Sequence, residues 1–216
     1  MATIFVLNKT NSIANQFLAQ LRDADIQQDK ARFRQNQEKL GEILAYELSK
    51  TLKYEAKEIQ TPLGTANINI PADEPVLGTI LRAGLPFHQG FMNYFDQSAS
   101  AFVTAYRKVK RNGNFIIQVD HISAPNLDDK VFILCDTMLA TGQSVVAVCK
   151  ELMAQYKIKE LHIAAVIAST EGVAHVRANL PKAKLWLCAI DDEMTSKAYI
   201  VPGLGDAGDL AFGDKV

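Results

Sequence analysis

The sequence predicts an α/β fold in which a parallel sheet carries helices on both faces. Apolar runs of strand length alternate along the chain with segments whose apolar residues recur at helical spacing. This alternation is typical of parallel sheets, because each strand needs a crossover connection to reach the next. The length of 216 residues fits one α/β domain. Because the sequence contains no linker, repeat or low-complexity tract, we expect residues 1–216 to form a single domain.

The individual elements are predicted from local patterns. Residues 11–50 have a helical pattern with an apolar face and a polar face. Residues 54–70 predict a hairpin of two strands about Pro62-Leu63-Gly64, and Asn112-Gly113 is a typical turn for a second hairpin. Further strands are expected at 76–81, 101–107, 131–135, 161–168 and 184–190, and further helices after Gly84, at 145–156 and near 173–178.

Composition and charge exclude several classes of protein. The formal net charge of −1 gives no general basic surface for nucleic acid, and no apolar run reaches the length of a membrane span. We therefore expect neither a nucleic acid nor a membrane as partner, and a cytoplasmic location. Cys135, Cys149 and Cys188 are odd in number and widely spaced, which predicts core residues instead of disulfides or a zinc site. A nucleophilic Cys135 is the disfavoured alternative.

Residues 131–144 combine a strand, a short loop and the start of a helix. The apolar run ends in Asp136, and small or hydroxylated residues continue to Ser144. A helix N-terminus favours an anion, and Gly142 lets the backbone approach one closely. Asp136, expected at the carboxyl end of the strand, could accept hydrogen bonds from two ribose hydroxyls. The segment predicts a ribose 5-phosphate site; the alternative is an ordinary strand-to-helix turn with Asp136 near a helix cap.

Three segments resemble the type I phosphoribosyltransferases, and among them the uracil phosphoribosyltransferase family. Residues 136–144 are similar to the phosphoribosyl diphosphate loop, residues 79–84 to the diphosphate-binding segment, and residues 199–209 to the uracil-binding segment. Thr137, Gln143 and Thr170 depart from the usual Pro, Gly and Pro of the family. The resemblance implies a type I phosphoribosyltransferase-like sheet flanked by helices, with a β-hairpin arm and a C-terminal base-binding loop.

The resemblance also implies a reaction, in which a uracil nitrogen displaces diphosphate from phosphoribosyl diphosphate to give UMP. The implied catalytic residues are Asp136 for the ribose hydroxyls, Arg82 for the diphosphate and Asp206 near the sugar that becomes cation-like. A solvated strand-end role is the alternative for Arg82. The implied substrate-binding residues are Arg82, Arg107, Asp136, Thr137, Met138, Leu139, Ala140, Thr141, Gly142, Gln143, Ser144, Ile200, Gly205, Asp206 and Ala207.

The cofactor and the partners are predicted from the proposed reaction and from individual residues. We expect Mg²⁺ to be held mainly through the diphosphate and not by a protein metal site, since the loop has only one acid, Asp136. Consecutive apolar residues at 115–117 predict a homodimer or a higher homo-oligomer. A GTP activator is left open.

The competing functions are a transferase for another base, which residues 199–209 disfavour, and a nucleotide-sensing regulator on the same fold.

Overall fold

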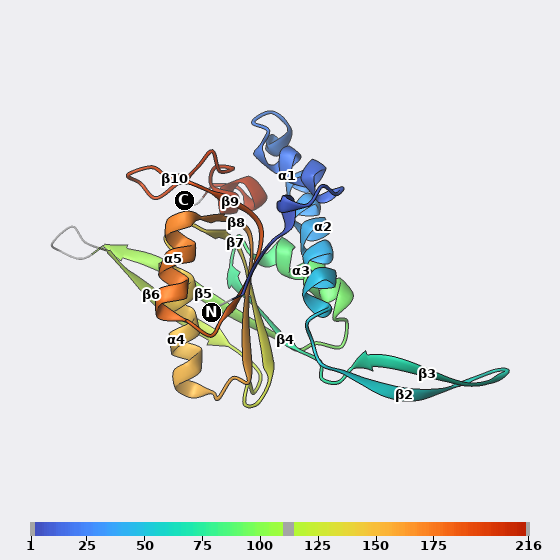
Figure 1. Ribbon diagram of the computed structural model, residues 1–216. Coiled ribbons are helices and arrows are strands. Elements are labelled where there is room, and N and C mark those ends of the chain that lie inside the picture. The colour runs from blue at the N-terminus through green and yellow to red at the C-terminus, as the bar shows by residue number, and fades with distance from the viewer. Residues whose placement is uncertain (1–2, 110–114, 215–216) are drawn as a thin grey trace.

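The computed structural model describes residues 3–109 and 115–214, and its centre is a seven-stranded sheet (Figure 1). Neighbouring strands are parallel except for the last pair, which is antiparallel. The strands lie in the order β1 (Ile4–Val6), β9 (Lys184–Asp191), β8 (Glu160–Ser169), β7 (Val131–Leu139), β4 (Val76–Leu81), β5 (Ser100–Val109) and β6 (Phe115–Ser123).

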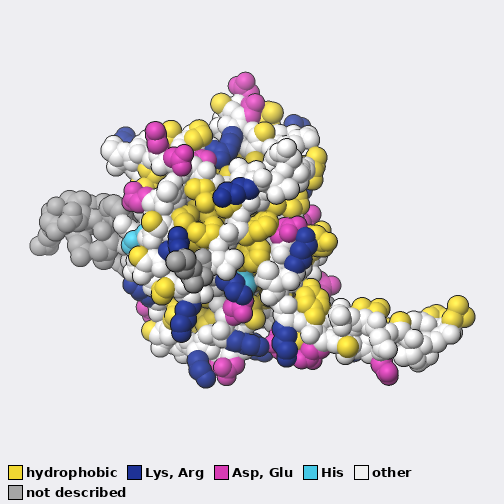
Figure 2. Space-filling model, in the orientation of Figure 1, with side chains coloured by type: hydrophobic (Ala, Val, Ile, Leu, Met, Phe, Trp, Pro, Cys, Tyr) yellow, Lys and Arg dark blue, Asp and Glu magenta, His cyan; other side chains and the backbone are white. Residues whose placement is uncertain are grey.

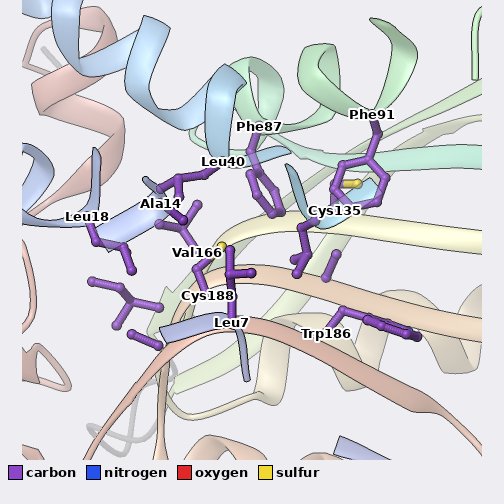
Figure 3. Close-up of a cluster of buried hydrophobic side chains, with 14 of the residues drawn as sticks. Leu7, Ala14, Leu18, Leu40, Phe87, Phe91, Cys135, Val166, Trp186 and Cys188 are labelled. Atoms are coloured by element: carbon purple, nitrogen blue, oxygen red, sulfur yellow. The ribbon is translucent and has the colours of Figure 1, made fainter. Parts of the chain in front are cut away.

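Helices cover both faces of this sheet, which confirms the predicted fold class (Figure 1). One face packs against α1 (Ala14–Arg22), α2 (Lys30–Ser49) and α3 (Leu85–Tyr94), and the other against α4 (Gln143–Gln155) and α5 (Thr170–Asn179). In the first layer, Phe87 and Phe91 of α3 point toward Cys135 and Val166 of the sheet (Figure 3). Both aromatic side chains are fully buried. Two buried apolar layers therefore fix the strand ends that form the site.

Two short strand pairs lie outside the central sheet. The antiparallel pair β2 (Tyr54–Thr61) and β3 (Gly64–Pro71) forms an arm that projects from the body of the molecule (Figure 1). Its turn is at Pro62-Leu63, as predicted. The second pair is β10 (Glu193–Met194) with β11 (Ile200–Val201), and a short helix α6 (Ala207–Phe212) follows it near the C-terminus.

The structure differs from the predicted elements at several boundaries. Strand β1 was not predicted, and the helical stretch 11–50 is interrupted by a single 3₁₀ turn, η2 (Ile26–Gln28). Helix α2 starts anew after Asp29, whose carboxylate accepts the N–H groups of Ala31 and Arg32 at its N-terminus. A second 3₁₀ turn of the same length, η1 (Leu7–Lys9), follows β1. The predicted turn Asn112-Gly113 lies outside the described residues.

The cysteines are buried and free, as predicted. Burial raises the pKa of the Cys135 thiol well above its usual range, and the Cys149 pKa rises to about 12 for the same reason. A thiol must ionise to act as a nucleophile, so the structure disfavours the nucleophilic interpretation of Cys135. Within the described ranges, no helix is long and apolar enough to cross a membrane.

Candidate active site

A pocket of about 560 Å³ lies where β7 ends, α4 begins and the C-terminal segment returns to the sheet. Such a position, outside the carboxyl ends of parallel strands, is where open α/β sheets bind ligands. Its wall is formed by Ala83, Ala105, Tyr106, Asp136, Met138, Leu139, Ala140, Thr141, Gly142, Ser144, Val145, Lys197, Ala198, Tyr199, Gly205, Asp206, Ala207 and Gly208. The phosphate loop and the C-terminal segment, distant in sequence, therefore share one pocket.

Asp136 lies at this pocket inside β7, not at the end of the strand as predicted. The strand continues to Leu139, because its pairing with β8 runs on to Ala168. The Asp136 carboxylate accepts the N–H of Thr137 at 2.8 Å. Burial raises the pKa of Asp136 to about 7, and hydrogen bonds from the N–H groups of Thr137 and Met138 oppose that rise. The carboxyl therefore ionises near neutral pH.

The N-terminus of α4 opens into the pocket without a side-chain cap. Its N-cap residue is Gly142, with φ 72° and ψ −6°, which has no side chain to cap the helix. Among the described residues, the Thr141 hydroxyl accepts only the N–H of Gln143, at 3.4 Å. By contrast, Asp29 caps α2 and Ser169 caps α5. Uncapped N–H groups and the helix dipole attract an anion. Asp136 does not cap this helix, so the competing interpretation of the segment loses its support.

Of the predicted loop residues, Thr137 and Gln143 do not line the pocket; for Gln143 we expected only the backbone N–H to face the phosphate, and this stays a prediction. The Thr137 side chain is fully buried and lies outside the pocket wall, and its hydroxyl is 2.6 Å from the carbonyl oxygen of Ala83 and 3.0 Å from Oε1 of Gln37. Thr137 therefore joins β7 to the turn after β4 and does not present its side chain to a ligand. Gln143 is also absent from the pocket wall, and its N–H faces the Thr141 hydroxyl at 3.4 Å.

Neither of the two predicted arginines is part of the described pocket wall. The Arg82 guanidinium is turned toward the C-terminal segment, where Nη2 donates to Oδ1 of Asp209 at 3.1 Å and to the carbonyl of Gly213 at 3.2 Å. Its side chain is 40% exposed and is not part of the pocket wall. Arg107 lies in β5, next to the pocket residue Tyr106, and its side chain is outside the described part of the structure.

The C-terminal segment brings three of its four predicted residues to the pocket. Gly205, Asp206 and Ala207 line it, whereas Ile200 is buried in β11 and is not part of the wall. The segment is not a loop throughout, because α6 begins at Ala207. Asp206 caps this helix by accepting the N–H of Gly208 at 2.9 Å. The cap fixes the direction of the Asp206 carboxylate at the edge of the pocket.

Sequence reasoning missed several pocket residues. Ala105 and Tyr106 come from β5, and Lys197 and Ala198 precede the segment that resembles a uracil site. Their positions adjoin the predicted residue Arg107 and the start of the predicted segment 199–209, so proximity along the chain was the available indication. No local pattern of their own marks them, because their side chains reach the pocket only through the packing of the hairpin and the C-terminal segment.

Comparison with known proteins gives consistent matches over almost the whole chain. A family model described as uracil phosphoribosyltransferase matches residues 8–214. A uracil phosphoribosyltransferase of Porphyromonas gingivalis is 48% identical over 211 residues, covering 97% of this chain and 98% of the relative. One from Methanothermobacter thermautotrophicus is 37% identical over 205 residues, covering 94% and 93%. The solved structure of the AQ2163 protein from Aquifex aeolicus has a TM-score of 0.87 at 25% identity and covers 99% and 100%.

Proposed function

The chain belongs to the uracil phosphoribosyltransferase family, and we infer from this premise that it transfers the 5-phosphoribosyl group of phosphoribosyl diphosphate to uracil. The products are UMP and diphosphate, and the role is pyrimidine salvage. One observation in the structure supports this inference. The N-terminus of α4, which has no N-cap side chain, and residues 205–207 line the same pocket. A sugar phosphate and a base bound to these two walls are neighbours.

The sugar phosphate is held by β7 and α4. In this proposal the 5-phosphate lies at the α4 N-terminus, where N–H groups and the hydroxyls of Thr141 and Ser144 donate to its oxygens. Asp136 accepts hydrogen bonds from the ribose hydroxyls, for which it must be ionised. Its pKa of about 7 makes this interaction stronger as the pH rises through neutrality. Together these groups fix the anomeric carbon, and no covalent nucleophile is needed.

The diphosphate is proposed to bind beside the turn that follows β4. Arg82 would exchange its contacts with Asp209 and Gly213 for the diphosphate oxygens, which its planar guanidinium suits. The pair with Asp209 is solvent-exposed, and exposed pairs are weak, so the exchange costs little. Arg107 is the second proposed contact. Asp206, at the edge of the pocket, would favour the positive charge that develops on the sugar carbon.

Magnesium is proposed as the cofactor and would be held mainly through the substrate. In the described ranges, no group of three or more His, Cys, Asp or Glu side chains could hold a metal ion. Diphosphate and ribose oxygens with water supply the oxygen ligands that Mg²⁺ prefers, and the ion would neutralise part of the leaving group's charge.

A cytoplasmic location and activation by GTP are also proposed. Adding GTP to the activity assay checks the second proposal.

Uracil is expected to be preferred over cytosine by a large factor. In the proposed site, backbone groups of Gly205 and Ala207, which line the pocket, read the edge of the base, and the predicted contact of Ile200 stays a prediction. Cytosine presents an amino donor where uracil has its C4 carbonyl, so an N–H there would face another donor. Each unmatched buried polar group costs about 1–3 kcal/mol, which predicts a kcat/KM roughly ten- to a hundredfold lower for cytosine.

The assay that tests the function measures UMP formation from uracil and phosphoribosyl diphosphate with Mg²⁺. Parallel reactions contain cytosine, hypoxanthine, orotate or 5-fluorouracil, and only 5-fluorouracil, which keeps both carbonyls, should replace uracil. Turnover of another base with rejection of uracil would contradict the base assignment and leave the phosphoribosyl site in place. Binding of phosphoribosyl diphosphate without any turnover would favour the nucleotide-sensing regulator.

A homo-oligomer is proposed because the β2–β3 arm has no partner strand within the described residues. An isolated two-stranded ribbon is at best marginally stable in water. Leu63 at its turn is fully exposed, and Ile68 is 50% exposed; Figure 2 shows hydrophobic atoms along this projection and at its far end. We propose that a second copy covers the arm. The earlier expectation placed the contact at 115–117, where only Ile117 has a described side chain, and it stays a prediction.

Light scattering at micromolar concentration is expected to give at least a dimer. The double variant Leu63→Glu, Ile68→Glu should shift the protein toward the monomer, because charges would have to be buried against the second copy. Met153→Glu on α4 makes the same change at a side chain that is 52% exposed and should leave the mass unchanged. A monomeric wild-type protein would contradict the proposal.

A further inference from the structure

The base-binding segment is held from behind by an ion pair between distant elements. Arg22, at the end of α1, and Asp191, at the end of β9, form two parallel hydrogen bonds of 2.8 Å between Nη1 and Oδ2 and between Nη2 and Oδ1. The side chains are only 24% and 7% exposed, respectively. Bidentate geometry and low exposure make this a directional interaction, unlike most surface pairs.

This ion pair binds both backbone groups of Gly203. Nη1 of Arg22 also donates to the Gly203 carbonyl at 3.0 Å, and the Gly203 N–H donates to Oδ2 of Asp191 at 2.9 Å. Gly203 has φ +58°, and an ideal Cβ there would lie 2.1 Å from the carbonyl oxygen of Ile200. The tight turn after β11 therefore requires glycine, and the ion pair holds this turn at two points.

The next residue along the segment is held by the same N-terminal region. With its amide nitrogen facing inward, Gln27 donates to the carbonyl of Leu204 at 2.8 Å and to that of Leu21 at 3.1 Å. Gly203 and Leu204 are buried, and the following Gly205 and Asp206 line the pocket. Arg22 and Asp191 themselves lie outside the pocket wall.

We propose that Arg22 and Asp191 are positioning residues for uracil, acting through the backbone of Gly203 on residues 205–207. The proposal rests on the function inferred above. A base that is read by backbone groups is discriminated only if the backbone stays in place, because a mobile N–H or carbonyl can adjust to the wrong base. The ion pair supplies that rigidity from two elements that are themselves packed on the sheet.

Loosening the pair should affect uracil and spare the sugar phosphate. Arg22→Lys keeps the charge but cannot make the bidentate contact and the Gly203 bond together. Asp191→Asn keeps the shape and removes the charge. For both variants we expect the KM for uracil to rise about tenfold, the size of one lost charge-assisted hydrogen bond. The KM for phosphoribosyl diphosphate should stay within about twofold, and the preference for uracil over cytosine should fall.

A matched control separates positioning from general stability. Glu160 at the start of β8 forms an ion pair with Lys184 and contacts His162 at 2.6 Å, at the opposite end of the sheet from the pocket. Glu160→Gln should lower the melting temperature and leave both KM values unchanged. Hydrogen–deuterium exchange, measured well below the melting temperature, should show faster exchange at 202–208 for the Arg22 and Asp191 variants and not for Glu160→Gln.

The outcomes distinguish this proposal from the function on which it rests. If the wild-type protein makes no UMP, the proposed function is wrong, and exchange at 202–208 still reports whether the ion pair holds the segment. If the wild-type protein makes UMP, unchanged exchange in Asp191→Asn overturns the positioning proposal alone. Faster exchange with an unchanged KM for uracil also overturns it, as does an equal rise of both KM values.

Discussion

Asp136→Asn is expected to lower kcat/KM for phosphoribosyl diphosphate by roughly 10²- to 10³-fold and yet to stabilise the fold above neutral pH. The loss of activity follows because a neutral amide offers one acceptor oxygen and no charge to two ribose hydroxyls; hydrogen bonds to charged groups contribute about 1.5–3 kcal/mol each. The gain in stability follows because an ionised carboxyl at this buried position is unfavourable.

The pH dependence of stability has a definite sign. The pKa of Asp136 rises from its ordinary 3.8 to about 7 in the folded protein. Between these values the folded state holds a proton that the unfolded state has released, so the contribution to stability is complete below about pH 4 and is lost as the pH rises through 7. The slope between these pH values is at most about 1.4 kcal/mol per pH unit, because one proton is involved.

Thermal unfolding of both proteins between pH 4 and pH 8 measures this effect. Asp136→Asn should have the higher melting temperature at pH 8 and no advantage at pH 4, while the activity of the wild-type protein rises with pH through about 7. Asp128→Asn is the control, since Asp128 is an exposed carboxylate that accepts the N–H of Lys157. An active Asp136→Asn protein would remove this residue from the ribose site.

The fold was largely predictable because the pattern of apolar residues is strong in the central strands. Every residue of β8 from Leu161 to Ser169 is buried, and such continuous runs indicate parallel strands covered on both faces. Strand β1 could not be predicted, because three residues are too few to show a period and their pairing with β9 depends on tertiary contacts. The end of β7 was misplaced, because Asp136 and Thr137 are polar residues inside a strand.

Pocket residues could be predicted where they belong to a local sequence motif. Residues that only tertiary packing brings together could not. Ala140, Thr141, Gly142 and Ser144, which the sequence pattern singles out, do line the pocket. Nothing near Arg22 or Asp191 indicates that they meet, because they are far apart in the chain and belong to different elements. Thr137 is the opposite case, a motif residue that does not face the pocket. The motif suggested a ligand contact, but strand alternation in β7 turns its hydroxyl inward to Ala83.

Gly142→Val is expected to abolish most activity and to destabilise the protein as well. Gly142 has φ +72°, which a β-branched residue rarely adopts. An ideal Cβ at this position would lie 2.8 Å from the carbonyl oxygen of Gly172 and 3.1 Å from Cγ2 of Val176, both in α5. The side chain cannot be accommodated unless the start of α4 moves away from α5, and that movement displaces the N–H groups proposed to bind the 5-phosphate.

Two measurements on Gly142→Val distinguish backbone strain, which lowers the melting temperature, from loss of the phosphate site, which lowers the affinity for phosphoribosyl diphosphate. Strain and crowding of this kind cost roughly 3 kcal/mol, which lowers the melting temperature of a domain of this size by about 6–12 °C. Calorimetric affinity for phosphoribosyl diphosphate, measured on folded protein at low temperature, should fall by at least about 10²-fold, because several N–H contacts to one phosphate are lost together. Gly142→Ala should have a melting temperature and an affinity between those of the wild type and those of Gly142→Val, because alanine adds the same Cβ without the branch. Wild-type affinity in the folded valine variant would place the 5-phosphate away from the α4 N-terminus.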